Sequence, residues 1–260
     1  MCQECGCAMT GTVTIHTGAT AHGHHHHDHH HDHVTNIDVA SGILRQNDIE
    51  AGHNRAHLHA HDIVTINLMS SPGSGKTSLL EATIEALAGR WRIAVIEGDL
   101  ETENDAMRIR AKGVPAVQIT TGQGCHLDAS MVHDALHRLD LSAIDLLFIE
   151  NVGNLVCPAG FDLGQDANVV LLAVTEGEDK PAKYPVMFRA ADLVLLTKTD
   201  LLPHLDDFSP DAARAHVRAL ANPAEVLELS ARLPASLGPW IAWLNQRLAL
   251  AHAHMPAADR

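Results

Sequence analysis

Residues 63–77 read Ile-Val-Thr-Ile-Asn-Leu-Met-Ser-Ser-Pro-Gly-Ser-Gly-Lys-Thr, and this stretch decides the fold. The apolar run Ile63–Met69 predicts a buried strand, and the loop after it opens a predicted helix over Lys76–Gly89. Residues 75–77 match the end of the phosphate-binding pattern G-x-x-x-x-G-K-[ST], whose first position is Ser70 here. Small residues allow successive backbone N–H groups to surround phosphate oxygens at a helix N-terminus. The stretch therefore predicts nucleotide binding, against the alternative of a chance Gly/Ser turn.

Six residues of this loop are predicted to contact the nucleotide. Lys76 is expected to reach the β- and γ-phosphates and to serve catalysis there, and the Thr77 hydroxyl is expected to bind Mg²⁺. The predicted contacts are Gly73, Ser74, Gly75, Lys76, Thr77 and Ser78.

Strands and helices alternate through the rest of the chain. The expected strands are Ile63–Met69, Ile93–Ile96, Val117–Thr120, Leu146–Ile149, Val169–Val174, Leu193–Leu196 and Val226–Leu229. The expected helices are Lys76–Gly89, Glu103–Lys112, Leu127–Leu139, Pro210–Ala221 and Ala235–Leu250. Nearly all-apolar strands separated by helices predict an α/β fold with a doubly wound, mainly parallel sheet covered on both faces. Ligands are then expected at the carboxyl ends of the strands.

Two later strand ends predict which base is bound. The strand before Thr197 runs into Thr-Lys-Thr-Asp, where the Asp200 carboxylate can accept two hydrogen bonds from guanine while the Lys198 stem covers the ring. Adenine offers no such donor pair, so the pattern favours GTP over ATP. Ser230 and Ala231 follow the last strand and resemble the guanine loop of GTPases. Thr197 stands where GTPases usually have Asn, and its hydroxyl can still tie the loop.

Carboxylates at two other strand ends are candidates for Mg²⁺ and for hydrolysis. Asp99 follows one predicted strand and Glu150 follows another, where a hard cation near the phosphates would need them. Asp105 has three open roles: a helix N-cap, a switch residue or a group that orients the attacking water. Gly153 lies where its N–H can sense the γ-phosphate. The water-activating group stays unassigned, and slow intrinsic hydrolysis is expected.

Histidine is the outlier of the composition, with 21 copies in 260 residues, and nine of them lie in residues 22–33. Residues 1–33 are polar and of low complexity, which predicts disorder in the absence of metal. An expression tag is the alternative, although the run is interrupted by Asp and lies inside the chain. Imidazoles bind nickel, zinc and copper, so the run predicts several weak sites. The proposed ligands are His24, His25, His26, His27, His29, His30, His31 and His33.

Cysteines give two further candidate metal sites. Cys2, Cys5 and Cys7 can converge on one ion with the α-amino group, as a square-planar Ni(II) or Cu(II) set or a tetrahedral Zn(II) set. A redox-prone tail is the alternative. Downstream, Cys125-His126 and Cys157 lie just past strand ends, near the predicted switches. Three ligands are too few for a closed tetrahedral site, so water, another ligand or a second subunit would complete it.

Charge and hydropathy exclude other classes. The formal net charge of −14 argues against nucleic-acid partners, which need a surplus of Lys and Arg. No apolar run is long enough for a transmembrane helix and the start does not resemble a secretory signal, so a cytoplasmic protein without membrane partners is expected. The predicted organisation is a metal-binding segment 1–33, a linker 34–61 with a weakly amphipathic helix and a looser histidine set, a GTPase domain 62–250 and a tail 251–260.

Three longer motifs resemble the HypB family of hydrogenase nickel-incorporation GTPases. They are Gly98-Asp-Leu-Glu-Thr-Glu-Asn-Asp105-Ala-Met-Arg-Ile, Gly122-Gln-Gly-Cys-His-Leu-Asp128 and Glu150-Asn-Val-Gly-Asn-Leu-Val-Cys-Pro158. The resemblance covers residues 62–250 and extends to the Cys-x-x-Cys-Gly-Cys start. It implies a P-loop NTPase fold of the SIMIBI type and delivery of nickel to the large subunit of [NiFe] hydrogenase.

The resemblance also implies site roles and partners. It assigns the domain's metal site to Cys125, His126 and Cys157, with Ni²⁺ or Zn²⁺ bound, and a tight nickel site to Cys2, Cys5 and Cys7. It implies a homodimer in the GTP-bound state with the metal site at the interface, and a second nickel chaperone as partner. In some members the histidine run is linked to nickel storage. Two rival functions are urease nickel insertion, against which the cysteine motifs argue, and metal storage with a vestigial nucleotide domain.

Overall fold

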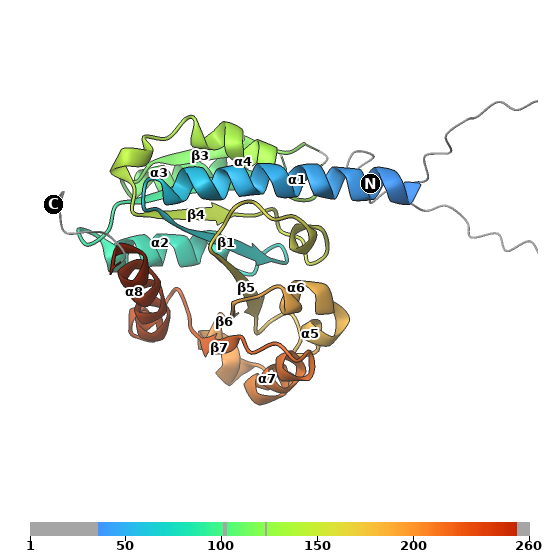
Figure 1. Ribbon diagram of the computed structural model, residues 1–260. Coiled ribbons are helices and arrows are strands. Elements are labelled where there is room, and N and C mark those ends of the chain that lie inside the picture. Colours follow the sequence, from blue (N-terminus) through green and yellow to red (C-terminus); the bar gives the residue numbers. More distant parts are fainter. Residues whose placement is uncertain (1–35, 101–102, 123, 254–260) are drawn as a thin grey trace, which may run out of the picture.

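The computed structural model describes residues 36–100, 103–122 and 124–253. A seven-stranded parallel sheet has the order β3-β2-β4-β1-β5-β6-β7 (Figure 1). The strands are β1 (Val64–Ser70), β2 (Ile93–Asp99), β3 (Ala116–Thr120), β4 (Leu146–Glu150), β5 (Ala167–Ala173), β6 (Leu193–Thr197) and β7 (Glu225–Glu228). This confirms the predicted fold class and all seven strands.

Helices cover both faces of that sheet. The α-helices are α1 (Asn36–His59), α2 (Lys76–Leu87), α3 (Asn104–Ala111), α4 (Ala129–Leu136), α5 (Lys180–Lys183), α6 (Pro185–Arg189), α7 (Pro210–Ala219) and α8 (Gly238–Ala253). Short 3₁₀ turns are η1 (Leu141–Ala143), η2 (Cys157–Gly160), η3 (Thr199–His204) and η4 (Pro234–Leu237). Helices α5 and α6 were not predicted, because they are too short to show a helical period in the sequence.

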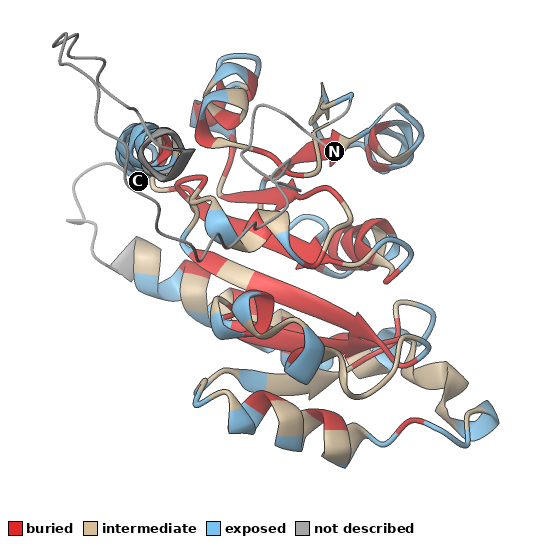
Figure 2. Ribbon diagram, turned by 90° about the vertical axis from the view of Figure 1, so that its right-hand side faces the viewer, coloured by how far each residue is buried: buried red, intermediate tan, exposed pale blue. Residues whose placement is uncertain are grey.

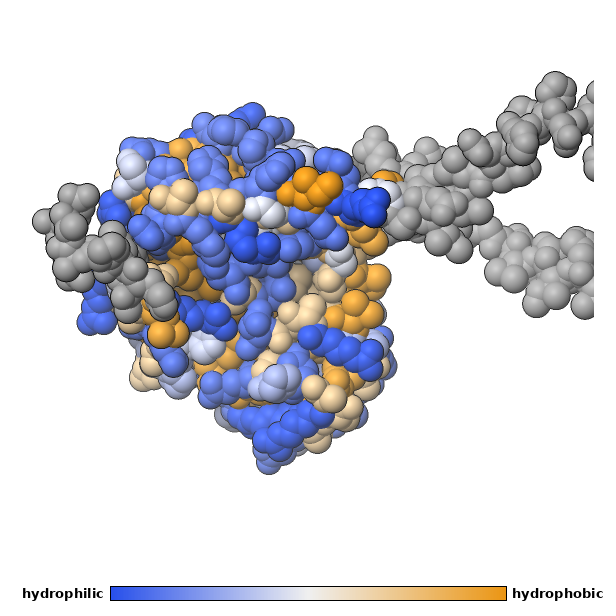
Figure 3. Space-filling view, in the orientation of Figure 1, coloured by the Kyte–Doolittle hydropathy of each residue, from blue (hydrophilic) through white to orange (hydrophobic). Residues whose placement is uncertain are grey.

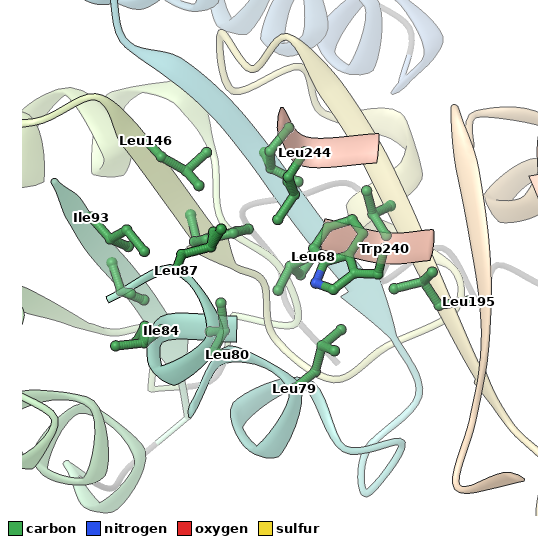
Figure 4. Packing of buried hydrophobic residues seen from close by; sticks show 14 of the residues in the cluster. Leu68, Leu79, Leu80, Ile84, Leu87, Ile93, Leu146, Leu195, Trp240 and Leu244 are labelled. Atoms are coloured by element: carbon green, nitrogen blue, oxygen red, sulfur yellow. The ribbon is translucent and has the colours of Figure 1, made fainter. Parts of the chain in front are cut away.

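The core divides by sheet face because side chains alternate along a strand. On β4, Leu146 and Phe148 pack with α2 and α8, whereas Leu147 and Ile149 pack with α1 and α4. Trp240 of α8 is 1% exposed and packs among leucines of α2 and of the sheet (Figure 4). Its indole N–H donates to Thr83 Oγ1 at 2.9 Å. Strand residues are mostly buried while the outer helix faces are exposed (Figure 2). The sheet is therefore a rigid scaffold for the loops at its carboxyl edge.

Helix α1 was expected only as a weakly amphipathic helix within a linker, and it is a continuous helix packed on the domain. Leu44 and Ile49, two of the apolar residues on which that expectation rests, are 41% and 48% exposed. The buried face of α1 consists of Ala51 and Leu58 together with two asparagines. Asn47 and Asn54 hydrogen bond to backbone atoms of Ala129, where α4 begins, and to the carbonyl oxygens of residues 162 and 163.

Gly164 has a φ of +92° and allows α1 to approach closely. A Cβ at this position would lie 2.7 Å from Asn54 Cβ and 2.8 Å from the Ala51 carbonyl oxygen. No described helix is long and apolar enough to cross a membrane.

Candidate functional site

The loop between β1 and α2 has the conformation expected of a phosphate cradle. Gly73 and Gly75 have φ values of +74° and +98°, which L residues with a side chain rarely adopt. Lys76 is buried, and its Nζ donates to Ser70 Oγ at 3.0 Å. Ser74 Oγ also donates to Ser70 Oγ, at 2.5 Å. Ser70, the departure from the usual glycine, therefore holds Lys76 at the mouth of the loop.

An acidic cluster lies against this loop. Carboxylate oxygens of Glu97, Asp105 and Glu150 lie within 4.8 Å of one another, and Thr77 Oγ1 donates to Glu150 Oε1 at 2.9 Å. Among the described residues, Glu97 Oε2 and Glu150 Oε2 are buried and have no hydrogen-bond partner. Buried carboxylate oxygens without partners are costly unless a cation binds them, so the cluster suits a hard divalent ion.

Burial is the main cause of the electrostatic character of this cluster. It raises the pKa of Glu150 to about 7, although the Lys76 ammonium and the Thr77 hydrogen bond lower that pKa. Burial raises the pKa of Glu97 to about 8, and the neighbouring carboxylates of Glu150, Asp105 and Asp99 raise it further. Without a cation these side chains hold protons near neutral pH, and a bound cation would displace them.

Glu97 was missed as a site residue, and Asp99 is placed differently from the expectation. Strand β2 continues to Asp99, so both residues pair with β3 in the sheet and do not lie in a following loop. Glu97 is 1% exposed and points into the cluster, whereas Asp99 is not a member of it. Asp99 Oδ1 accepts from Leu100 N at 2.7 Å. Alternation along the strand places Glu97 and Asp99 on the same face of the sheet, so burial and not periodicity separates the two residues.

Asp105 joins the acidic cluster, and one of its three predicted roles is wrong. Helix α3 begins at Asn104 with Glu103 at the N-cap position, so Asp105 is not the N-cap. Its carboxylate accepts from Arg108 at 2.8 Å, and Arg108 also donates to Glu81 on α2. The switch and water-orienting roles of Asp105 stay predictions.

A cavity of about 460 Å³ extends from the phosphate loop to the predicted guanine loops. Its lining includes Ser74, Gly75, Ser78, Lys198, Asp200, Ser230 and Ala231. Asp200 Oδ1 accepts from Ser230 Oγ at 2.6 Å, which holds the two predicted base-binding loops together. The cavity thus joins a phosphate cradle to a carboxylate that faces a base-sized space.

Thr197 and Lys198 tie the base loop to the phosphate loop. Thr197 Oγ1 donates to the Ser74 carbonyl oxygen at 2.7 Å, which is the loop-tying hydrogen bond predicted for this substitution. Lys198 has a φ of +60°, and its Nζ donates to the Gly73 carbonyl oxygen at 2.6 Å. In this position the Lys198 stem lies along the cavity, as expected for a side chain that covers a base.

Cys125, His126 and Cys157 converge as predicted. Their ligand atoms lie within 4.8 Å of one another, and the two Sγ atoms are 2.8 Å apart, beyond the roughly 2.05 Å of a disulfide. His126 is 6% exposed and stacks on Phe161 with a centroid distance of 3.8 Å. Burial lowers the pKa of His126, which keeps the imidazole in its neutral, ligating form. Two sulfurs and one nitrogen suit a borderline ion such as nickel or zinc.

One buried amide connects the two clusters. Asn151 follows Glu150 directly, and its Oδ1 accepts from Leu127 N at 3.2 Å, next to His126. Asn151 Nδ2 donates to Asn67 Oδ1 of β1 at 3.3 Å. Gly98 lies against the Leu127 side chain, since a Cβ there would lie 2.8 Å from it.

Gly153 lies against the phosphate loop. A Cβ at Gly153 would lie 2.9 Å from Pro72 Cα, so only glycine permits this approach. The contact of its N–H with the γ-phosphate stays a prediction. The tail ligands predicted in residues 1–33 lie outside the described residues.

Comparison with known proteins agrees with this geometry. The sequence model of the CobW/HypB/UreG nucleotide-binding domain matches residues 64–228. Hydrogenase maturation factor HypB of Azotobacter vinelandii is 59% identical over 209 residues, covering 80% of this chain and 69% of that protein. HypB of Escherichia coli K12 is 51% identical over 209 residues, covering 80% and 72%. The chain belongs to the HypB family.

Solved HypB structures resemble the whole described domain. HypB from Helicobacter pylori in complex with nickel has 39% identity and a TM-score of 0.76, covering 83% of this chain and all of that one. HypB from Archaeoglobus fulgidus has 37% identity and a TM-score of 0.73, covering 78% and 99%. The HypB fold thus accounts for the sheet, the phosphate loop and the loops at the carboxyl edge.

Proposed function

We propose that this HypB-family chain hydrolyses GTP and carries nickel, which it delivers to the large subunit of [NiFe] hydrogenase during maturation. One observation supports the coupling of these two activities. Glu150 contacts the phosphate loop through Thr77, and the next residue, Asn151, bonds the backbone beside His126. A change in nucleotide state at Glu150 has a short covalent and hydrogen-bonded route to the metal ligands.

The nucleotide half of the proposal rests on the cavity and the acidic cluster. Lys76 neutralises charge on the β- and γ-phosphates, Gly153 N–H senses the γ-phosphate, and Asp200 with the Ser230–Ala231 loop selects guanine. Thr77, Glu150 and Asp99 are the Mg²⁺ residues expected from the sequence, and Glu97, whose buried Oε2 has no hydrogen-bond partner, extends that set. When bound there, Mg²⁺ neutralises phosphate charge. The products are GDP and phosphate, formed slowly.

Nickel is the cargo of the Cys125, His126 and Cys157 cluster, with Zn²⁺ as an alternative occupant. Three ligands leave the coordination open, so a second copy of the chain completes or caps the site in a GTP-bound homodimer. The support is chemical: sulfur and imidazole donors hold the ion, and an open position allows release. By linkage, nickel binding and nucleotide binding change each other's affinity by the same factor.

The tail completes the proposed carrier. Cys2, Cys5 and Cys7 form a tight nickel site, and the histidines of residues 24–33 store further ions. A second nickel chaperone and the hydrogenase large-subunit precursor are the proposed partners, in the cytoplasm. The H. pylori HypB structure in complex with nickel supports nickel as the ion.

Hydrogenase activity in cells that carry Lys76→Ala tests this function. We expect loss of hydrogenase activity, which only excess nickel could restore, because Lys76 is proposed to contact the phosphates and is not a nickel ligand. Lys183→Ala, an exposed lysine paired with Asp179, serves as the control. Unchanged hydrogenase activity in Lys76→Ala would instead favour metal storage with a vestigial nucleotide domain.

A further inference from the structure

Four histidines gather on the outer face of the domain, away from the cysteine cluster. His57 and His61 lie one turn apart near the end of α1, and His133 and His137 lie one turn apart on and just past α4. The His57 ring centroid is 5.6 Å from that of His61 and 6.0 Å from that of His137. His133 and His137 centroids are 4.6 Å apart, with the rings nearly perpendicular.

The protonation of His133 follows from its neighbours. Asn54 Nδ2 donates to the carbonyl oxygens of Ala129 and Leu163, at 2.8 and 3.2 Å, so the orientation of this amide is determined. Asn54 Oδ1 then faces His133 Nδ1 at 3.1 Å and can only accept. His133 Nδ1 must therefore donate, and in the neutral imidazole Nε2 carries a lone pair.

A carboxylate supports the same tautomer. Glu50 Oε1 lies 3.3 Å from His133 Nδ1. A ring N–H directed at a carboxylate or carbonyl oxygen is the usual outer support of a metal-ligating histidine, since it orients the ring and makes the ligating nitrogen more basic. His133 has both partners.

The lone pair of His133 points at a second imidazole nitrogen. His133 Nε2 and His137 Nε2 are 3.1 Å apart. Two nitrogens that each lie about 2.0–2.1 Å from one ion are separated by about this distance. Without an ion the same distance allows one imidazole to donate to the other, so geometry alone permits both states.

We propose that His133 and His137, with His57 and His61 beside them, form a second transition-metal site that binds a borderline divalent ion such as Ni²⁺ or Zn²⁺. Two imidazole nitrogens already lie at the separation that two ligands of one ion would have, and a rotation of His57 or His61 would add a third. The remaining positions belong to water, because His61 and His137 are exposed. Figure 3 shows a largely hydrophilic surface around α1, interrupted by apolar side chains along the helix, of which Leu44 and Ile49 are exposed.

The local electrostatics suit a cation site. Burial lowers the pKa of His57, and the neighbouring His61, His137 and His133 lower it further, so this imidazole stays neutral and able to ligate. His59 points elsewhere and pairs with Asp166 at 2.7 Å, which excludes it from the set. The site bridges α1 and α4, and an ion there would clamp the two helices together.

The site is separate from the cysteine cluster but shares its segment of chain. His126 precedes Ala129, the first residue of α4, and His133 lies about one turn further along that helix. The inference does not depend on the proposed function, because it needs neither nucleotide nor Cys125 and Cys157.

Hydrogen exchange of the full chain, measured by mass spectrometry with and without Zn²⁺ or Ni²⁺, tests the site. We expect the metal to slow exchange in peptides that cover residues 53–61 and 129–138, because an ion clamps α1 to α4. The protection should be lost in His133→Gln/His137→Gln. It should persist in His204→Gln, an exposed histidine of η3, and in Cys125→Ser/Cys157→Ser, which removes the other cluster.

The single variant His137→Gln, at an exposed position, guards against misfolding of the double variant and should also reduce the protection. Matching exchange of all variants without metal shows that they are folded. Two outcomes overturn the proposal. The first is an absence of metal-dependent protection of residues 53–61, which would mean that His133 and His137 only hydrogen bond to each other. The other is protection that survives His133→Gln/His137→Gln or disappears in Cys125→Ser/Cys157→Ser.

Discussion

The acidic cluster and the cysteine cluster are built alike and differ in chemistry. Each brings three ligand atoms within 4.8 Å at the carboxyl edge of the sheet, one on β2, α3 and β4, the other on the loops after β3 and β4. The first offers buried carboxylate oxygens and suits a hard ion, whereas the second offers sulfur and imidazole and suits nickel or zinc. The two sites therefore select different ions by their donor atoms. Strand β4 and the loop after it connect them.

Loss of the Lys76 ammonium should give the largest effect, and this effect should be confined to the nucleotide site. Lys76→Ala should slow GTP hydrolysis at least about 100-fold, because removal of one donor to developing charge typically costs that much. Phosphate release by the purified chain measures it, with Lys183→Ala as the control. Metal affinity of the cysteine cluster in the nucleotide-free chain should stay unchanged. Hydrolysis within a few-fold of the unchanged chain would remove Lys76 from the site.

Removal of a sulfur ligand should have the converse effect. Cys157→Ser should weaken Ni²⁺ binding at the cysteine cluster at least about 100-fold. Loss of a residue that only supports a metal ligand can already cost this much, and Cys157 is a ligand itself. Protection of Cys125 from alkylation, followed by mass spectrometry as nickel is titrated, reports this site without interference from the tail. Val156→Ala, at an exposed neighbour, is the control. Full protection of Cys125 in Cys157→Ser would exclude a shared ion.

The base pocket provides a third test on the nucleotide side. Asp200→Asn should weaken GTP binding about 10- to 100-fold, because one or two hydrogen bonds to a charged acceptor are lost. Xanthosine triphosphate should bind better than before, since its O2 can accept from the new amide. Fluorescent-nucleotide competition measures both, with Asp211→Asn, which is 96% exposed, as the control. An unchanged preference for GTP would show that Asp200 does not contact the base.

Glu97 should produce the smallest effect, a pH dependence of stability. Its pKa is raised from 4.5 to about 8, so between these values the folded, metal-free protein holds a proton that the unfolded chain releases. The free energy of unfolding therefore falls as pH rises across this window. Glu97→Gln should flatten that fall, seen as a smaller change of Tm between pH 5 and pH 8. Glu103→Gln is the exposed control, and an equal slope in Glu97→Gln would contradict the assignment.

Motifs with local chemistry were predictable from the sequence. The apolar strands gave the sheet, and the phosphate loop, Asp200 with Ser230, and the cysteine cluster all met at its carboxyl edge because parallel strands end there. Thr197 tied the loop as its hydroxyl suggested.

Contacts that depend on exact register were not predictable. Glu97 was missed because the strand was predicted to end at Ile96, three residues before its end at Asp99, which placed Glu97 in a loop. The packing of α1 was missed because Asn47 and Asn54, which are polar, occupy the buried positions that apolar periodicity was expected to mark. The grouping of His57 and His61 with His133 and His137 depends on the packing of α1 against α4, which the sequence does not show.

Nucleotide state should change the metal affinity of the cysteine cluster through Asn151. The most direct measurement is nickel affinity at Cys125 and Cys157, from alkylation protection, in a non-hydrolysable GTP analogue and in GDP, with dimer formation followed in parallel. We predict affinities that differ at least about fivefold, the lower end of usual coupling, and a smaller difference in Asn151→Ala with unchanged Tm. Equal nickel affinity in the two nucleotide states would contradict the account.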